Sequence, residues 1–169
     1  MSTVKKINIS NLPNFSRDKA LLSIVERDVP EEANKFFKNL LLKPFNINQK
    51  VYKKSSFDDI KRILDKTIKK KIEDNIFYNE WIKDMAKVSV IFCNILKTES
   101  IILSLESSRS CKRYHIDNVP MRLLVTYYGK GTEWLPSHTC DYSAYYNGEK
   151  NEKIIINQAE IKFIDAWNI

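Results

Sequence analysis

Glycine is scarce in this chain of 169 residues, because Gly129, Gly131 and Gly148 are the only three. Phosphate-binding P-loops and the dinucleotide-binding fingerprint need several glycines at fixed spacing beside a helix. The chain therefore lacks the residues for either loop. It also lacks the G-x-S-x-G elbow of serine hydrolases and the H-E-x-x-H motif of zinc proteases. These four common routes to catalysis are excluded.

Cysteines and long apolar runs are scarce as well. Cys93, Cys111 and Cys140 form no C-x-x-C pair, so neither a disulfide framework nor a zinc ribbon is expected. The best uncharged apolar run, Val88–Leu96, is far shorter than the roughly 20 residues of a membrane-spanning helix. The N-terminus has no compact apolar signal core. We expect a cytoplasmic protein without a membrane span.

Positive charge is concentrated in the first part of the chain. Residues 1–99 carry 20 Lys and Arg against 13 Asp and Glu, whereas residues 100–169 carry eight of each. The surplus is densest at Lys66–Lys71 and is made of lysine, which forms poorer bidentate contacts than arginine. A surface of this kind either attracts nucleic acid or is the solvated face of a helix. We expect the solvated face and no specific binding of nucleic acid.

The spacing of apolar residues changes near residue 99. Before it, apolar residues recur every three or four positions, which predicts helices over residues 16–27, 30–43, 56–76 and from residue 79 onward. After it, β-branched runs predict strands over residues 101–106, 121–128, 153–156 and 160–164, with a tight turn at 129–132. The predicted fold is α+β, with a helical part (1–99) packed on an antiparallel β part (100–169) in one compact domain.

His115 and Asp117 are the most informative pair of residues. Side chains two positions apart in an extended segment project to the same side, so an imidazole and a carboxylate lie together here. This pair is half of the 2-His-1-carboxylate set that binds non-haem Fe(II). The structural alternative is that Asp117 accepts a hydrogen bond from His115 and fixes its tautomer.

The surrounding residues form a longer pattern. The segment from Cys111 to Pro136 resembles a mainly bacterial family, domain of unknown function 1826, with the pattern C-x-R-F-H-x-D-x-V-x-x-R-L-x-x-T-Y-x-G-P-G-T-x-W-L. The matching residues are Cys111, Arg113, His115, Asp117, Val119, Arg122, Leu123, Thr126, Tyr127, Gly129, Gly131, Thr132, Trp134 and Leu135. Tyr114 and Lys130 replace a phenylalanine and a proline of the pattern.

The family motif is in turn similar to the HxD strand and Gly-x-Thr hairpin of double-stranded β-helix iron/2-oxoglutarate oxygenases. This resemblance implies a partial double-stranded β-helix, that is, a cupin-like fold, for residues 100–169. It implies that His115 and Asp117 are metal ligands, and that Fe(II) and 2-oxoglutarate are the cofactors. If the chain is an enzyme, the resemblance implies an iron-dependent oxygenase.

Five further residues of the motif are candidates for binding a substrate or co-substrate. Arg122 and Arg113 carry planar guanidinium groups that bind carboxylates, although a structural ion pair is the alternative, above all for Arg113. Thr126, Tyr127 and Trp134 can face the same cavity. A half-buried strand or an apolar core uses these residue types too.

A third metal ligand is not evident. Family members continue beyond the point matched by Ile169 with a histidine that would be the natural third ligand, so we expect an incomplete site. His138 and Glu133 are the first candidates to complete it, and Cys111 and Cys140 are either soft ligands beside the site or inert packing. The alternative to an oxygenase-like protein is a non-enzymatic binding protein with a degenerate metal site and a basic helical surface.

Overall fold

The computed structural model describes residues 4–17, 22–41, 44–68, 75–108 and 111–169. Contacts divide the chain into two compact units, each built from segments that are distant in the sequence. The first unit comprises residues 1–8, 19–29 and 110–169, and the second comprises residues 9–18 and 30–109. Among the helices of the described stretches, none combines the length and the apolar character needed to cross a membrane.

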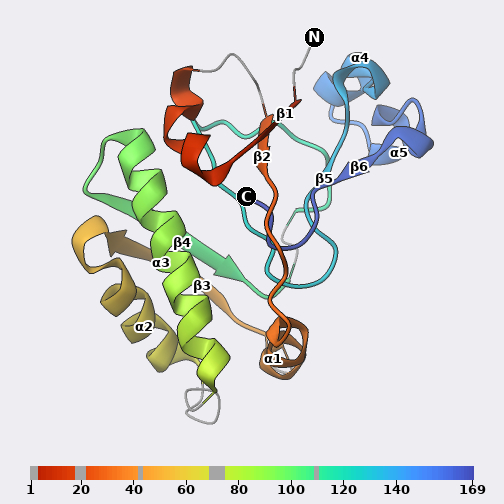
Figure 1. Cartoon of the computed structure of the whole chain (residues 1–169). Helices are drawn as coiled ribbons and strands as arrows, with labels where there is room; N and C mark the ends of the chain where they lie inside the picture. Colours follow the sequence, from red (N-terminus) through yellow and green to blue (C-terminus); the bar gives the residue numbers. More distant parts are fainter. Residues whose placement is uncertain (1–3, 18–21, 42–43, 69–74, 109–110) are drawn as a thin grey trace. The chain divides into compact units, whose positions relative to one another are not determined.

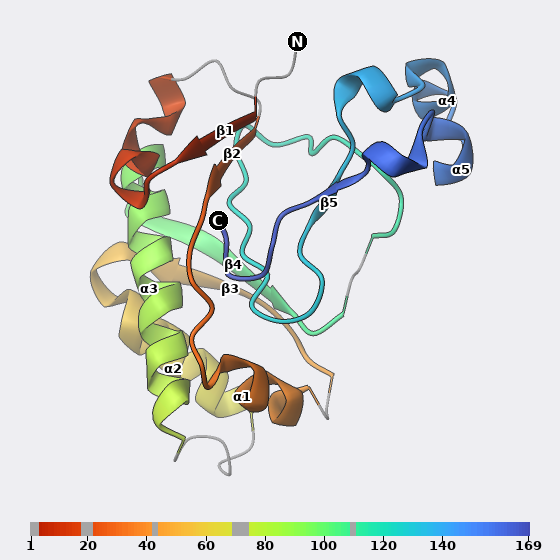
Figure 2. The ribbon, with the colours of Figure 1, turned by 45° about the vertical axis from the view of Figure 1, so that its right-hand side comes forward.

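The second unit holds the longer helices and one sheet. Its elements are the 3-10 helix η1 (Ile9–Arg17), helix α1 (Ala33–Leu40), strand β3 (Asn46–Tyr52), the 3-10 helix η2 (Lys53–Ser55), helices α2 (Ser56–Thr67) and α3 (Ile76–Leu96), and strand β4 (Ser100–Glu106). Strands β3 and β4 form an antiparallel pair, with α2 packed on β3 and α3 packed on β4 (Figures 1 and 2).

Buried apolar residues and exposed polar residues along β3 show which face of this sheet is buried. Ile47 and Val51 are buried and pair with Leu105 and Ile101 of β4, whereas intervening residues such as Lys50 are exposed. Side chains two positions apart share a face of a strand, so the apolar set lies on one side. The sheet therefore has one buried face and one solvated face.

Helix α3 carries the largest part of the apolar core of the second unit. Its first turn is capped by the Asn75 side chain, which accepts a hydrogen bond from the Phe77 amide at 2.8 Å. It ends at Lys97, which adopts the left-handed conformation with φ of 53°. Five aromatic rings from α1 and α3 pack at centroid separations of 5.1 to 6.5 Å: Phe36, Phe37, Phe77, Tyr78 and Trp81.

Asp59, a buried carboxylate, joins β3 to α2. Its Oδ2 accepts hydrogen bonds from the Tyr52 amide at 3.0 Å and the Ser55 hydroxyl at 2.9 Å, and its Oδ1 is paired with Arg62. The hydrogen bond from the Tyr52 amide is the main reason why the pKa of Asp59 lies below its usual value. The carboxylate thus fixes the sharp connection between strand and helix.

The first unit has shorter elements. They are strands β1 (Val4–Ile7), β2 (Leu22–Val25), β5 (Glu133–Trp134) and β6 (Lys162–Phe163), helices α4 (Tyr142–Tyr146) and α5 (Asn151–Ile154), and the 3-10 helices η4 (Ser137–Thr139) and η5 (Gln158–Glu160). β1 pairs with β2 in parallel, and β5 pairs with β6 antiparallel.

The last three residues of the chain are held against β2. Val25 and Ile169 exchange two backbone hydrogen bonds, of 2.8 and 3.1 Å. Arg27 donates from Nε to the Trp167 carbonyl at 2.6 Å and from its amide to Asn168 Oδ1 at 2.8 Å. Trp167, Asn168 and Ile169 are consequently buried.

The mixture of helices with small two-stranded sheets, one of them parallel, confirms the α+β class, and most helix predictions hold in part. Helix α1 lies within the range 30–43, and α3 covers the helix expected from residue 79. Helix α2 occupies the first part of the range 56–76, of which residues 69–74 lie outside the described residues. The helix expected over 16–27 is wrong at Leu22–Val25, which form β2, and residues 18–21 of this range lie outside the described residues. Strand β2 occupies part of this range because its backbone pairs with β1, and such long-range pairing outweighs local preference.

Two of the four strand predictions are wrong. Strand β4 confirms 101–106, and β6 lies within 160–164. Residues 121–128 are not part of a strand, and α5 occupies the start of the range 153–156. At α5, Ile154 is fully buried, so one apolar anchor in a helical turn gives the same local pattern as a short strand. Strands β1 and β3 in the first part of the chain were not expected.

Candidate functional site

The HxD segment, which we define as residues 111–122, runs without regular secondary structure in the first unit. Its backbone is held by the α4–α5 clamp, which we define as Tyr145 and Asn151. The Asn151 side chain accepts a hydrogen bond from the Tyr114 amide at 2.9 Å and donates one to the Lys112 carbonyl at 2.6 Å. The Asn151 amide thus satisfies one backbone N–H and one backbone C=O of the segment, as the hydrogen bonds from a neighbouring β-strand would do.

Arg113 attaches the same segment to the end of α4. Its guanidinium donates to the Tyr145 carbonyl at 2.7 Å and to the Glu149 carbonyl at 3.0 Å, and it lies 5.3 Å from the centroid of the Tyr145 ring. The Tyr145 hydroxyl accepts a hydrogen bond from the Ile116 amide at 3.1 Å. Arg113 is thus bound to backbone carbonyl groups, and the backbone on both sides of His115 is fixed from α4 and α5.

The orientation of the His115 ring is set by a backbone carbonyl. Its Nδ1 lies 2.8 Å from the Arg113 carbonyl oxygen. Because a carbonyl oxygen only accepts hydrogen bonds, Nδ1 must carry the proton and donate it. In the neutral ring, the lone pair then resides on Nε2.

Nε2 of His115 lies near a carboxylate. Nε2 of His115 lies 3.4 Å from Oδ1 of Asp117, and the same Oδ1 lies 3.1 Å from Nη1 of Arg122. The side chains of His115 and Arg122 are about half exposed, at 45% and 48%, and that of Asp117 is 29% exposed. The structure thus brings together three of the predicted site residues at a place open to solvent.

The interaction between a nitrogen lone pair and a nearby anionic oxygen is repulsive unless a cation lies between or beside the two atoms. The available cations are a proton on Nε2, the guanidinium of Arg122 and a metal ion. Two ligand atoms of one ion, each at about 2.1 Å and separated by a right or tetrahedral angle, lie about 3.0 to 3.4 Å apart. The separation between Nε2 and Oδ1 fits two ligands of one ion.

The donor set stops at these two atoms. Over the part of the chain that the structure describes, no cluster of three or more His, Cys, Asp or Glu residues is placed to hold a metal ion. The Sγ of Cys111 lies 3.7 Å from Nδ1 of His115, the ring nitrogen that donates to the Arg113 carbonyl. One ion cannot bind both ring nitrogens, so Cys111 does not complete this donor set.

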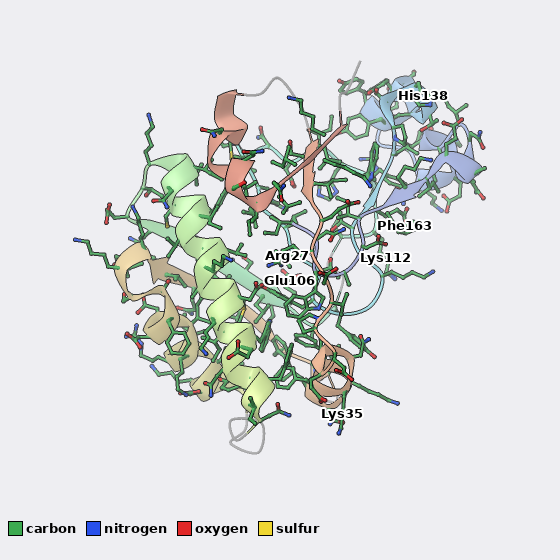
Figure 3. The ribbon with its side chains drawn as sticks, in the orientation of Figure 1. Arg27, Lys35, Glu106, Lys112, His138 and Phe163 are labelled. Atoms are coloured by element: carbon green, nitrogen blue, oxygen red, sulfur yellow. The ribbon has the colours of Figure 1, made fainter. Side chains whose placement is uncertain are left out.

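His138 and Glu133 are engaged elsewhere in the first unit. His138 Nε2 lies 2.7 Å from Glu160 Oε2, and this hydrogen bond is the main reason why the pKa of the Glu160 carboxyl lies below its usual value. Figure 3 shows His138 at the end of this unit remote from Lys112, which belongs to the HxD segment. Glu133 accepts a hydrogen bond from the Tyr114 hydroxyl.

Thr126, Tyr127 and Trp134 contact the C-terminal residues. The Thr126 carbonyl accepts from the Trp167 amide at 2.7 Å, and the Tyr127 ring packs edge-on against Trp167 with centroids 4.9 Å apart. Trp134 belongs to β5 and pairs with Lys162 of β6.

Gly131 is the one glycine whose lack of a side chain is required by close packing. A Cβ at this position would lie 1.4 Å from the carbonyl oxygen of Ile164. The next residue, Thr132, accepts a hydrogen bond from the Ile164 amide at 2.9 Å. The glycine therefore lets the segment after the HxD motif approach the C-terminal strand.

The sequence model of the family described as Protein of unknown function (DUF1826) matches residues 8–169. The chain belongs to the DUF1826 family. No curated protein and no solved structure matches this DUF1826 chain.

Two contributors to the site of this DUF1826 protein escape sequence reasoning. Tyr145 and Asn151 lie 29 and 37 residues beyond their partners Ile116 and Tyr114. Both belong to short helices in a region where the sequence gives no motif. Asn151 is the first residue of α5, a position that carries no sequence signal for a contact with the HxD segment.

Proposed function

We propose that this DUF1826 protein binds a divalent metal ion weakly, through Nε2 of His115 and Oδ1 of Asp117. The observation that carries the proposal is the hydrogen bond from Nδ1 of His115 to the Arg113 carbonyl, which leaves the lone pair of the neutral ring on Nε2, 3.4 Å from Oδ1 of Asp117. Metal-ligating histidines ordinarily donate their other ring N–H to a carbonyl or carboxylate, because this fixes the tautomer and the ring orientation.

The expected affinity is low because the described residues supply two ligands. Tight sites for zinc or iron use at least three protein groups. Water or small anions would fill the remaining positions of the ion, which the exposure of His115 and Asp117 permits. Arg122 adds a positive charge beside Asp117 and lowers the affinity further.

The enzymatic form of this proposal is a divergent iron/2-oxoglutarate oxygenase with a cupin-like fold. Fe(II) would be the ion, held by His115 and Asp117, and would supply the site with the capacity to bind and activate O2. Arg122 would bind a carboxylate of 2-oxoglutarate through its planar fork. Since a pair of donors does not make a facial triad, metal binding is the function that the described residues support best.

A basic helical surface is less well supported as a binding site. On α2, Lys61 is paired with Asp65 at 3.0 Å, and Arg62 is paired with Asp59. These acids neutralise much of the local positive charge. The residues Lys69–Lys71 lie outside the described residues.

Calorimetric titration of Mn(II) or Co(II), as oxygen-stable substitutes for Fe(II), tests the proposal. His115→Ala should lower the affinity by at least about tenfold, since loss of a ligand costs no less than loss of an outer partner. His138→Ala is the matched control, because it removes the other histidine, which pairs with Glu160. Identical titrations of the wild type and His115→Ala would refute the metal site.

A further inference from the structure

We propose that residues 165–169, which we name the strap, open as a unit and uncover a site that binds an extended peptide. The strap site comprises Val25 in β2, Arg27 shortly after it, Thr126 and Tyr127, and all four contact the strap. In the closed structure the strap fills this site and so competes with any peptide in solution. All these contacts lie within the first unit.

The strap is held in the way that sheet edges hold peptides. Its backbone pairs with β2, because Val25 and Ile169 exchange two hydrogen bonds, as an added strand would do. Its largest side chain, the Trp167 indole, packs edge-on against Tyr127 and lies 5.8 Å from Cζ of Arg27. Trp167 and Ile169 are both buried by these contacts. In this mode of recognition the backbone hydrogen bonds supply affinity and the anchored side chains supply specificity.

The closed strap contains a strained residue. The Asn168 amide donates to the Asp165 carbonyl at 3.3 Å, which closes a turn of four residues with Trp167 at its third position and a φ of 72°. Positive φ at this position favours glycine, so a bulky side chain there favours opening by roughly tenfold. Two hydrogen bonds oppose this strain: Arg27 Nε donates to the Trp167 carbonyl at 2.6 Å, and the Thr126 carbonyl accepts from the Trp167 amide at 2.7 Å.

The side chains of the strap indicate which peptide the site accepts. Between the anchors Trp167 and Ile169, the Asn168 Oδ1 accepts a hydrogen bond from the Arg27 amide at 2.8 Å. We therefore expect an extended segment in which an aromatic residue, a side-chain acceptor and an aliphatic residue follow one another. The synthetic peptide of residues 163–169 is the probe. Because the tethered strap has an effective concentration of about millimolar, the free peptide competes only where the strap is weakened.

The first test is amide hydrogen exchange of the wild-type chain at low urea concentrations. Opening of the strap alone exposes little surface, so exchange at Val25, Trp167 and Ile169 should be independent of urea. Arg27→Gln should accelerate this exchange by about tenfold, because it removes the charged donor to the Trp167 carbonyl. Lys6→Gln, which removes an exposed cation of β1, should not. Exchange of the three amides only through global unfolding, with rates that rise with urea, would overturn the opening.

The second test adds the peptide to full-length Trp167→Ala, whose strap lacks its main anchor. The peptide should shift the Val25 amide resonance of this variant and slow its exchange, while the wild type stays unchanged. Trp167→Phe, which keeps a smaller ring, is the second host if the alanine variant does not fold. The same peptide with alanine in place of its tryptophan is the control and should have no effect. No binding of the unaltered peptide, or equal shifts from both peptides, would overturn the peptide site.

Discussion

Asp59 is a buried carboxylate whose three partners join the end of β3 to the first turn of α2. Asp59→Asn removes the charge that Arg62 pairs with, and it leaves the Tyr52 amide or the Ser55 hydroxyl with a poorer acceptor. We expect the free energy of unfolding at pH 7 to fall by about 1–3 kcal/mol. Urea unfolding followed by circular dichroism measures it, with Asp58→Asn, an exposed carboxylate on the same helix, as the control.

The same carboxylate predicts a dependence of stability on pH. The pKa of Asp59 in the folded protein is lowered, so the unfolded chain binds its proton first as the pH falls. The contribution of Asp59 is thus complete above the ordinary value of 3.8 and is lost as the pH falls through the lower folded value. Between pH 5 and pH 3, the wild type should lose more stability than Asp59→Asn. Parallel losses in the two proteins would contradict this.

Gly131 allows a second comparison of single residues. Gly131→Ala places a methyl group on the Ile164 backbone and should destabilise the protein by about 3 kcal/mol or more, since a backbone atom cannot rotate away. Gly129→Ala meets no atom within 4 Å but has φ of 84°, which costs about 1–2 kcal/mol. Thermal unfolding should therefore rank Gly131→Ala as the less stable variant, and the reverse order would refute the close approach.

At the scale of elements, the α4–α5 clamp positions His115, the first of the two proposed metal ligands. Tyr145→Phe removes only the hydroxyl that accepts from the Ile116 amide, whereas the backbone carbonyl that binds Arg113 remains. We expect Mn(II) affinity to fall about threefold to tenfold, with a stability loss of about 0.5–1.5 kcal/mol for one hydrogen bond. Tyr146→Phe, on the exposed neighbouring tyrosine, should leave Mn(II) titrations unchanged. Equal effects of the two variants on Mn(II) affinity would show that the Tyr145 hydroxyl does not position the HxD segment.

The spacing of apolar residues predicted those helices and strands whose own apolar side chains are buried in a core. Helix α3 and strand β4 follow from local pattern, since Trp81, Ile82 and Met85 lie on one helical face and exposure alternates along most of β4. Strand β2 was missed because its identity depends on β1, which lies in a distant part of the sequence. Likewise, the proximity of His115 and Asp117 follows from two-residue spacing, but the clamp of Tyr145 and Asn151 depends on tertiary contacts.

For the whole molecule, the net charge of +7 raises the question of a polyanionic partner. Because Lys61 and Arg62 are paired with acids on α2, we expect only weak association with nucleic acid, and it should fall steeply with added salt as counterions are released. Fluorescence anisotropy with labelled DNA and RNA measures it. A submicromolar complex at physiological salt that disappears when Lys69, Lys70 and Lys71 are changed to Glu would contradict this expectation.

Long-range proton–nitrogen NMR of the histidine rings tests directly whether the neutral His115 ring carries its proton on Nδ1 and so presents an Nε2 lone pair beside Asp117. The chain has two histidines, and their contacts imply opposite neutral tautomers: His115 donates from Nδ1 to a carbonyl, and His138 donates from Nε2 to Glu160. At a pH where imidazole is neutral, we predict the Nδ1–H form for His115, and diamagnetic Zn(II) should shift its Nε2 resonance while leaving His138 unchanged. An Nε2–H tautomer at His115, or a Zn(II) titration that shifts neither ring, would contradict the account.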